Sequence, residues 1–556
     1  MGSIAQDIRS TSDAGVLPVK GQCLPFTQVP HTTRLFADFL AYSPNVQRFY
    51  PRSPNFSEWL RQETPGLRYD AGRRRQVSGI LERLNRNWGA SERTMGNIAR
   101  LRAGASVAVT GQQVGLFGGP VFSLYKALTA VKLAEQATAA GMETVPVFWL
   151  ATNDHDLAEV NHVALPAANA VLQTLATASQ GGEDAPVGTV HFGDEIQSVV
   201  QAAAEIVGES PVTAFLRQSY RPGETLGSAF ARLFARLFAD WGVVLLDPCD
   251  PELQTVAGPV YGAAIECAEK IDNALLARGK ELEAAGYHQQ VKVTPSSTLL
   301  FTMRDGARVP VHRRINGSSI EFLVRDEKIS QADLLAQIAA APQDFTPNVL
   351  LRPVLQDHLL PTLAYTGGAA EVAYFAQVAV VYEELLGRVT PILPRFSATL
   401  VEPKMQSLLE RYHLSLPDLF HGEEKLRERI AAEILPSELQ QAFDQASESL
   451  DRCFIAVRGA LLNLDKTLAE AADHAKSKIQ HQLETLRARA GRAELRQTEM
   501  AARHAQLLST SLYPNKALQE REIAGVYYLA RHGTELLREI YANLHTDCHD
   551  HQVITL

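Results

Sequence analysis

Apolar residues in the first third of the chain form two short runs typical of buried strands, with a helical pattern between them. The run SVAVT (residues 106–110) is β-branched, and VPVFWLAT (residues 145–152) is a second apolar run. Between them, residues 121–141 carry apolar side chains at helical spacing and end on Gly141. This order predicts a βαβ unit, and strands that are apolar throughout predict a parallel sheet buried on both faces. The run WGVVLLDP (residues 241–248) predicts another such strand.

Two stretches interrupt this pattern. Residues 165–225 are rich in Ala and Gly with mixed signals, which indicates an insertion. Residues 288–342 alternate apolar and polar side chains with period two, and the dipeptides Asp305-Gly306 and Asn316-Gly317 are typical of hairpin turns. The second stretch therefore predicts a small antiparallel β insertion.

The last quarter of the chain has a nearly heptad pattern. From Phe454 to Leu486, apolar side chains recur at spacings of mostly three and four residues, with Lys, Glu, Arg and Gln between them. No proline occurs from Ser437 to Leu512. This pattern predicts a long helical hairpin or coiled coil. An ordinary helix packed on the core is the alternative, because the two patterns look alike.

Composition narrows the classes of protein that fit. The 556 residues carry a net charge of -9, and a protein that grips nucleic-acid phosphates usually has a basic surplus. The five cysteines are far apart and include no CxxC pair, which indicates a reduced protein. The N-terminal segment has no apolar signal region, and no apolar run approaches the ~18 residues that span a bilayer. We therefore expect a cytoplasmic protein that binds neither nucleic acid nor membrane.

The turn between the first strand and its helix, GQQVGLFGG, is the first candidate binding site. Its residues Gly111, Gln112, Gln113, Gly115 and Gly119 match neither GxxxxGK[ST] nor GxGxxG. Glycines at this point let backbone N–H groups face an anionic ligand, aided by the helix N-terminus. A tight turn that binds nothing is the alternative.

The helix that follows carries a possible counter-charge. Lys126 lies one turn into it, where its ammonium can neutralise a phosphate or carboxylate. Ser123 and Lys126 also match S-x-x-K, but the companion KTG and SDN motifs of acyl-serine enzymes are missing. A ligand-facing Lys126 is therefore preferred over a serine nucleophile.

A second cluster, Asp154, His155 and Asp156, follows the second strand directly. Open α/β sheets bind ligands at the carboxyl ends of their strands. Asp and His at such a place can act as a general base, a metal ligand or a hydroxyl acceptor. Helix capping before LAEV is the alternative.

Further candidates come from the segment LLRPVLQDHLLPTLAYTGGAAEVAYFAQ and the loop after it. Glu371 and Tyr374 share one helical face, which is either ligand-facing or solvated. The candidate binding residues of this region are Arg352, Gly367, Gly368, Glu371, Tyr374 and Arg395. The C-terminal HTDCHDHQ lacks zinc-type spacing, so we expect a polar tail and no metal site.

Four segments together resemble one family: VTGQQVGLFGGPVFSLYKA, VPVFWLATNDHDLAEVNHV, LLRPVLQDHLLPTLAYTGGAAEVAYFAQ and PRFSATLVE. They are similar, in sequence and in order, to the cysteine ligases of bacillithiol biosynthesis, the BshC family. The resemblance spans most of the chain.

The resemblance implies an α/β fold with a Rossmann-type parallel-sheet core, connective-peptide insertions and a long α-helical coiled coil that forms a homodimer. On this basis the expected segments are core to residue 164, an insertion at 165–225, core at 226–287, a β insertion at 288–342, core at 343–402, a coiled-coil domain at 403–510 and a helical segment at 511–556 that packs on the core.

The resemblance also implies a reaction: L-cysteine is added to glucosaminyl-malate through an amide bond, giving bacillithiol. The carboxylate must be activated, and ATP is a candidate for this, although the sequence identifies no cofactor. Asp154, His155 or Asp156 would be the base, and Arg352 and Arg395 would bind the malate carboxylates. Two alternatives are a nucleotide-binding dimeric scaffold without catalysis and a tRNA-linked enzyme, which the acidic composition disfavours.

This chain departs from the family pattern at one position of the loop-to-helix motif. Tyr125 stands where the family often has His. In related class I enzymes a histidine near this helix start contacts ATP phosphates, so the difference bears directly on how the loop binds its ligand.

Overall fold

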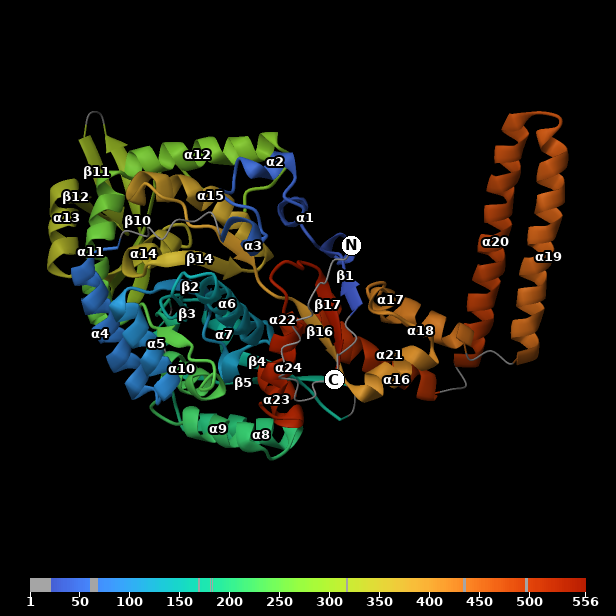
Figure 1. Ribbon diagram of the computed structural model, residues 1–556, viewed down its shortest axis with the longest axis horizontal. Coiled ribbons are helices and arrows are strands. Elements are labelled where there is room, and N and C mark those ends of the chain that lie inside the picture. The colour runs from blue at the N-terminus through green and yellow to red at the C-terminus, as the bar shows by residue number, and fades with distance from the viewer. Residues whose placement is uncertain are drawn as a thin grey trace, which may run out of the picture.

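The computed structural model describes residues 22–60, 69–168, 171–180, 182, 184–316, 319–433, 437–495 and 499–556. Figure 1 shows a large body that contains most of the chain, a smaller helical cluster beside it, and a helical hairpin that projects from this cluster. In this described part of the chain, no helix is both long enough and apolar enough to cross a membrane.

The large body is built around a parallel sheet with strand order β15-β14-β2-β3-β8. Its strands are β2 (Ser106–Gln112), β3 (Thr144–Leu150), β8 (Val244–Leu246), β14 (Thr362–Gly367) and β15 (Ile392–Pro394). Every neighbouring pair is parallel. From β2 the chain proceeds to β3 and β8 on one side, and only later to β14 and β15 on the other. This confirms the Rossmann-type core, with its switch point between β2 and β14.

Helices cover both faces of this sheet, which is why its strands are apolar throughout. Ala364 belongs to a buried cluster with Leu133 of α6 and Trp59 of α3. The next residue, Tyr365, points to the opposite face and stacks on Phe375 of α15, with ring centroids 5.1 Å apart. The helices of this body are α1 (Arg34–Leu40), α2 (Pro44–Gln47), α3 (Phe56–Leu60), α4 (Ala71–Asn87), α5 (Glu92–Ala103), α6 (Phe122–Ala139), α10 (Leu226–Leu237), α11 (Pro251–Glu266), α12 (Ala268–Ala284), α14 (Arg352–Leu359) and α15 (Ala369–Leu386).

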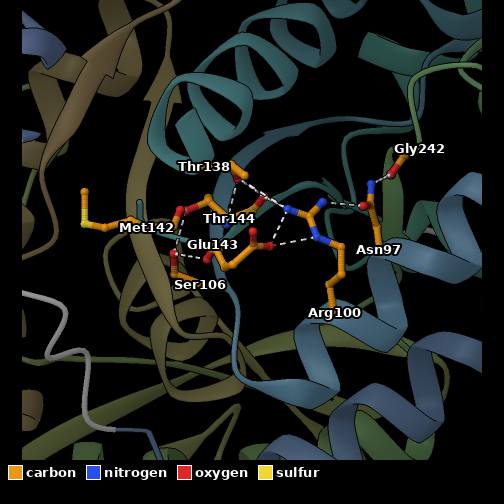
Figure 2. A network of polar contacts seen from close by, with 8 residues as sticks. All are labelled: Asn97, Arg100, Ser106, Thr138, Met142, Glu143, Thr144 and Gly242. Carbon is orange, nitrogen blue, oxygen red and sulfur yellow. Dashed lines mark hydrogen bonds and ion pairs between the residues drawn. The ribbon is translucent and has the colours of Figure 1, made fainter. Parts of the chain in front are cut away.

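A polar network fixes the amino-terminal edge of the sheet (Figure 2). Arg100 of α5 donates two hydrogen bonds to the Glu143 carboxylate, at 2.9 and 2.6 Å, and a longer one to the Thr144 carbonyl at 3.4 Å. The hydroxyls of Ser106 and Thr144 lie 2.8 Å apart and join the starts of β2 and β3. These contacts hold the two central strands in register, so their opposite ends meet at a fixed place.

Two groups of elements lie between strands of the parallel sheet, in the regions where the sequence predicted insertions. The first contains β4 (His162–Pro166), β5 (Leu172–Ala176), β6 (Ser179–Gln180), β7 (His191–Phe192), α8 (Glu195–Val207) and α9 (Pro211–Ser219), after the short α7 (Leu157–Val160). The second is an antiparallel sheet of β9 (Ser297–Arg304), β10 (Ala307–Asn316), β11 (Ser319–Val324), β12 (Glu327–Ser330) and β13 (Phe345–Pro347), with helix α13 (Gln331–Ala340). The expected turn lies at Asp305-Gly306, where both φ angles are positive. The other expected turn includes Gly317, which lies outside the described residues.

The C-terminal part begins with a strand that leaves the core. β16 (Ala398–Val401) lies in the segment expected to continue the core, but it pairs with β17 (His551–Thr555), which also pairs with β1 (Gln22–Leu24). The expectation of a polar tail at HTDCHDHQ is wrong from His551 onward, because His551 and Gln552 are buried in β17. This three-stranded sheet therefore joins β1, at the start of the described residues, to the last strand and to β16.

The helices after β16 form two different structures. A compact cluster with its own buried core contains α16 (Pro403–Arg411), α17 (Leu416–Leu419), α18 (Glu423–Glu433) and α21 (Glu499–Leu512). The helices α19 (Ser437–Leu462) and α20 (Lys466–Leu495) form the projecting hairpin, so the expected coiled coil covers only part of residues 403–510 (Figure 1). Short helices follow: α22 (Gln519–Glu522), α23 (Gly525–His532) and α24 (Leu536–Asn543).

Candidate active site

A cavity of about 600 Å³ opens at the carboxyl edge of the parallel sheet, at the switch point between β2 and β14. This is where open α/β sheets bind their ligands, because the connections diverge there and leave a crevice. Of the residues expected from the sequence, those on its wall are Gly111, Gln112, Gln113, Lys126, Asp154, Arg352, Gly368, Glu371, Tyr374 and Arg395. Segments far apart in sequence are thus brought together at one site.

Lys126 lies at the centre of this site, buried on the first turns of α6. Its ammonium donates hydrogen bonds to the Gly111 carbonyl at 2.7 Å and to the Gln112 side chain at 2.9 Å. It also forms an ion pair with Glu371 at 2.6 Å. Burial lowers the pKa of Lys126 to about 8, although Glu371 opposes this shift. Lys126 therefore loses its proton more readily than an exposed lysine does.

Glu371 is fixed as firmly as its partner. One carboxylate oxygen accepts the Gly368 N–H at 2.7 Å, which caps α15, and the other accepts the Tyr365 hydroxyl at 2.5 Å. Burial disfavours its charge, yet Lys126 and these donors hold the pKa of Glu371 below its usual value. A Cβ at Gly367 would lie 2.8 Å from the Glu371 Cβ, so the close approach of strand and helix requires glycine there.

Acidic groups follow β3 at one end of the cavity. The amide of Gln113 donates to Asp154 and to Glu159, both at 2.8 Å, and so holds two carboxylates on the wall. Asp154 also accepts the backbone N–H of His155 at 2.8 Å. Asp156 instead caps α7 by accepting the Glu159 N–H at 3.1 Å and does not line the cavity. For Asp156, the capping alternative accounts for its position.

His155 lies between the acidic group and the β insertion, with its Nδ1 3.6 Å from an Asp154 carboxylate oxygen. Its Nδ1 lies 3.2 Å from an Arg308 guanidinium nitrogen, which is a donor only, so Nδ1 must be the acceptor. Arg308 also bonds the Thr346 hydroxyl and the Pro347 carbonyl and lies over the Phe301 ring. Burial lowers the pKa of Arg308. His155 thus sits beside the cavity as a partner of Arg308.

Arginines gather at the other side of the switch point. Arg352, at the start of α14, donates to the Tyr374 hydroxyl at 3.2 Å and lies over the rings of Tyr365 and Trp149. Arg395, directly after β15, donates to the Glu520 carboxylate at 2.6 Å. Arg352 therefore lies over residues of β3 and β14, and Arg395 lies after β15 in an ion pair with Glu520.

The glycine turn contributes less to the cavity than its sequence suggested. Gly115 and Gly119 do not line it, and their N–H groups donate to carbonyls within the turn, at 3.0 Å each. The N–H of Gly118 reaches the Tyr220 hydroxyl at 3.2 Å. In this structure these N–H groups are engaged inside the protein, whereas Gly111, Gln112 and Gln113 reach the cavity.

Ser123 and Tyr125 are both on α6, but their side chains are buried in the protein interior and do not line the cavity. The Ser123 hydroxyl is buried without a hydrogen-bond partner in the described part of the chain, and no base lies beside it to activate it. Tyr125 is fully buried and packs edge-on against Phe396, with ring centroids 5.3 Å apart. The residue that replaces the frequent family histidine is thus withdrawn from the site.

Several residues of the cavity wall were not predicted from the sequence. Phe301 and Arg308 come from the β insertion, Glu159 from α7, and Arg521 from the C-terminal α22. Glu159 is close to Asp154 in the segment NDHDLAEV, so its presence at the site could have been predicted. Nothing in the sequence pattern indicates that the other three residues line the cavity. Their place depends on how the insertion and the C-terminal part fold back on the sheet.

The arrangement suits a ligand that carries both charges. Its wall carries the carboxylates of Asp154, Glu159 and Glu371, the guanidinium groups of Arg308, Arg352, Arg395 and Arg521, and the buried ammonium of Lys126. Among the described residues, no cluster of three or more His, Cys, Asp or Glu side chains could hold a metal ion.

Comparison with known proteins agrees with this architecture. Residues 20–396 match the family model "Bacillithiol biosynthesis BshC, N-terminal Rossmann-like domain", and residues 398–556 match "Bacillithiol biosynthesis BshC, C-terminal coiled-coil domain". A relative from Koribacter versatilis, named "Putative cysteine ligase BshC", is 49% identical over 532 residues, covering 96% of this chain and 99% of its own. Relatives of the same name from Solibacter usitatus (96% and 99% covered) and Salinibacter ruber (94% and 96% covered) are 35% and 34% identical. This chain therefore belongs to the BshC family of bacillithiol biosynthesis.

Proposed function

We propose that the protein is a ligase that adds L-cysteine to glucosaminyl-malate, joining the cysteine carboxyl to the glucosamine amine. The observation that carries this proposal is the distribution of charge in the cavity. An amino sugar linked to malate has an ammonium at one end and two carboxylates at the other. On the cavity wall, Asp154 and Glu159 follow β3, whereas Arg395 follows β15 and Arg352 lies over the Tyr365 ring of β14.

The strand order supports this match in size as well as in charge. Asp154 follows β3 and Arg395 follows β15, and these strands are separated by β2 and β14. Three strand spacings of about 4.8 Å place the two ends roughly 14 Å apart along the sheet edge. This span suits a sugar with a malyl group attached, and it exceeds the length of cysteine alone.

In this proposal Asp154 is the base. A protonated amine cannot attack a carboxyl carbon, so the glucosamine ammonium must first lose a proton. Asp154 is oriented by the Gln113 amide and the His155 N–H, and it lies on the cavity wall. Lys126 and Glu371, at the centre, would then contact the reacting carboxyl group.

The cysteine carboxylate must be activated before an amide can form, and ATP is a candidate source of that activation. Phosphate oxygens would need positive charge, which Arg352, Arg395 and Lys126 offer on the cavity wall. Gly115 and Gly119 would serve only if the turn rearranged, because their N–H groups are already bonded.

We also propose that the hairpin of α19 and α20 forms a homodimer. Its apolar side chains remain exposed in the single chain, including Ile455 at 71%, Leu464 at 77% and Leu486 at 56%. Buried alanines, Ala469 and Ala472, and ion pairs such as Arg458–Asp473 join the two helices, so the larger apolar groups are left for another partner. A second copy would cover this surface in coiled-coil fashion.

A matched pair of variants tests the reaction. Purified protein is supplied with L-cysteine, glucosaminyl-malate and ATP, and bacillithiol is quantified by thiol labelling and mass spectrometry. Asp154→Asn should slow formation roughly a hundred-fold or more, as expected for loss of a general base. Asp156→Asn, the same change two residues away, should leave the rate unchanged because Asn also caps helices. No product from the native protein, or equal rates in both variants, would contradict the proposal.

A further inference from the structure

The short helix α22, from the C-terminal part of the chain, directs three consecutive side chains to three different places. Gln519 bonds the backbone of β16, accepting the Leu400 N–H and donating to the Leu400 carbonyl, both at 2.8 Å. Glu520 points into the core towards Arg395. Arg521 points to the cavity and forms part of its wall.

Glu520 fixes the position of this helix. Its carboxylate is fully buried and accepts hydrogen bonds from Arg395 at 2.6 Å, from the Ser397 hydroxyl at 2.9 Å and from the Ala398 N–H at 3.0 Å. Burial opposes its charge, but Arg395 holds the pKa of Glu520 below its usual value. The Ser397 hydroxyl is itself bonded to His551 at 2.7 Å. α22 is therefore held rigidly against the end of β15.

Arg521 has no carboxylate within ion-pair distance among the described residues, although Glu520, Glu371 and Glu522 act on its charge from farther away. Many arginines on the surface do have an ion-pair partner. Its neighbour Arg395 already donates to Glu520 and to the Phe396 carbonyl. Arg521 therefore has more free donors than Arg395, and guanidinium groups bind carboxylates and phosphates through paired donors.

We propose that Arg521 binds an oxyanion of the ligand, so that the C-terminal part of the chain completes the active site. This inference rests on the proposed function only for what the ligand is. The shared chemistry is a carboxylate or phosphate group, supplied either by the malyl end of the substrate or by the activating nucleotide. The Rossmann-type domain alone would lack this contact.

The test measures binding of two probes, L-malate and inorganic pyrophosphate, to the full-length protein by isothermal titration calorimetry. Arg521→Gln should weaken binding of at least one probe by roughly ten-fold or more, the loss expected for a hydrogen bond between charged groups. The affinity of Arg521→Lys should lie between those of the native protein and Arg521→Gln, because lysine keeps the charge but loses the paired donors. Arg531→Gln is the matched control: it removes the same charge nearby, from an arginine paired with Glu402, and should leave both affinities unchanged.

Each outcome gives a distinct answer. Loss of malate binding alone assigns Arg521 to the malyl end, loss of pyrophosphate alone assigns it to the nucleotide, and loss of both still supports an oxyanion subsite. Unchanged affinities in Arg521→Gln, or no binding of either probe to the native protein, would overturn the inference. If Arg521 matters for binding but the native protein forms no bacillithiol, the inference stands and the proposed function falls.

Discussion

The buried pair of Lys126 and Glu371 makes the sharpest prediction from this structure. The perturbation is a double-mutant cycle of Lys126→Met, Glu371→Gln and the two combined. Either single change leaves one group buried without its charged partner, which typically costs about 3–5 kcal/mol of unfolding free energy. The double variant replaces the pair by neutral groups of similar size. It should therefore be less destabilised than the sum of the two single variants.

The size of the coupling follows from the geometry. Opposite charges 2.6 Å apart attract by about 6 kcal/mol at an effective dielectric constant of about 20. The side chains are only 4% and 17% exposed, so solvent screening is weak. Each group also keeps other partners, the Gly111 carbonyl for Lys126 and the Tyr365 hydroxyl for Glu371, which soften the loss. We expect a coupling free energy of about 3–6 kcal/mol.

Urea denaturation followed by circular dichroism measures the four unfolding free energies at one pH and salt concentration. The surface ion pair of Arg538 and Asp240 provides a control cycle, with an expected coupling below about 1 kcal/mol. A coupling for Lys126 and Glu371 as small as that of the control would refute the reasoning, because it would mean that the pair is solvated or not formed.

Three further changes test other parts of the structure. Burial lowers the pKa of Lys126 from 10.5 to about 8, so between these pH values the unfolded chain binds more protons than the folded one. The unfolding free energy, measured by urea titration, should therefore rise with pH across this range, by up to about 3 kcal/mol relative to Lys126→Met. Gly367→Ala places a Cβ against Glu371 and should cost about 1–3 kcal/mol while reducing bacillithiol formation; a thermal melt and rate equal to the native ones would exclude this contact. Replacing Ile455 and Leu464 by Asp should convert a dimer to a monomer in sedimentation velocity without lowering the melting temperature, and a native protein that sediments as a monomer would contradict the proposed dimer.

Much of the fold was predictable because its signals are local. Strands buried on both faces must be apolar throughout, and this property is enough to predict β2, β3 and β8 from the sequence. A coiled-coil helix repeats its apolar residues at regular spacings of three and four, and this repeat predicted the hairpin. The paths of β13 and β16 were not predictable, because strand pairing depends on partners distant in sequence. β16 follows β15 closely, yet it pairs with the last strand of the chain.

The site was predictable only where its residues follow strands of the sheet. Asp154, Glu371 and Arg395 each come shortly after a parallel strand, so topology alone brings them to one edge. Arg308 and Arg521 come from elements added to that edge from outside, and no sequence spacing relates them to it. Asp156 was predicted as a candidate base because of its residue type. In the structure it instead caps α7, by accepting the Glu159 N–H.

The replacement of histidine by Tyr125 now has a physical interpretation. Its ring packs against Phe396 within the core, and burial raises the pKa of its hydroxyl far above its usual value, so it can offer neither charge nor a readily ionised group. Any phosphate bound in this cavity must therefore be neutralised by other side chains. Arg521 is suited to this because its guanidinium group keeps its charge at physiological pH, whereas Lys126 is paired with Glu371 and Arg395 with Glu520. Neutralisation of a bound phosphate would then depend mainly on Arg521, and so on the C-terminal helix α22 that carries it.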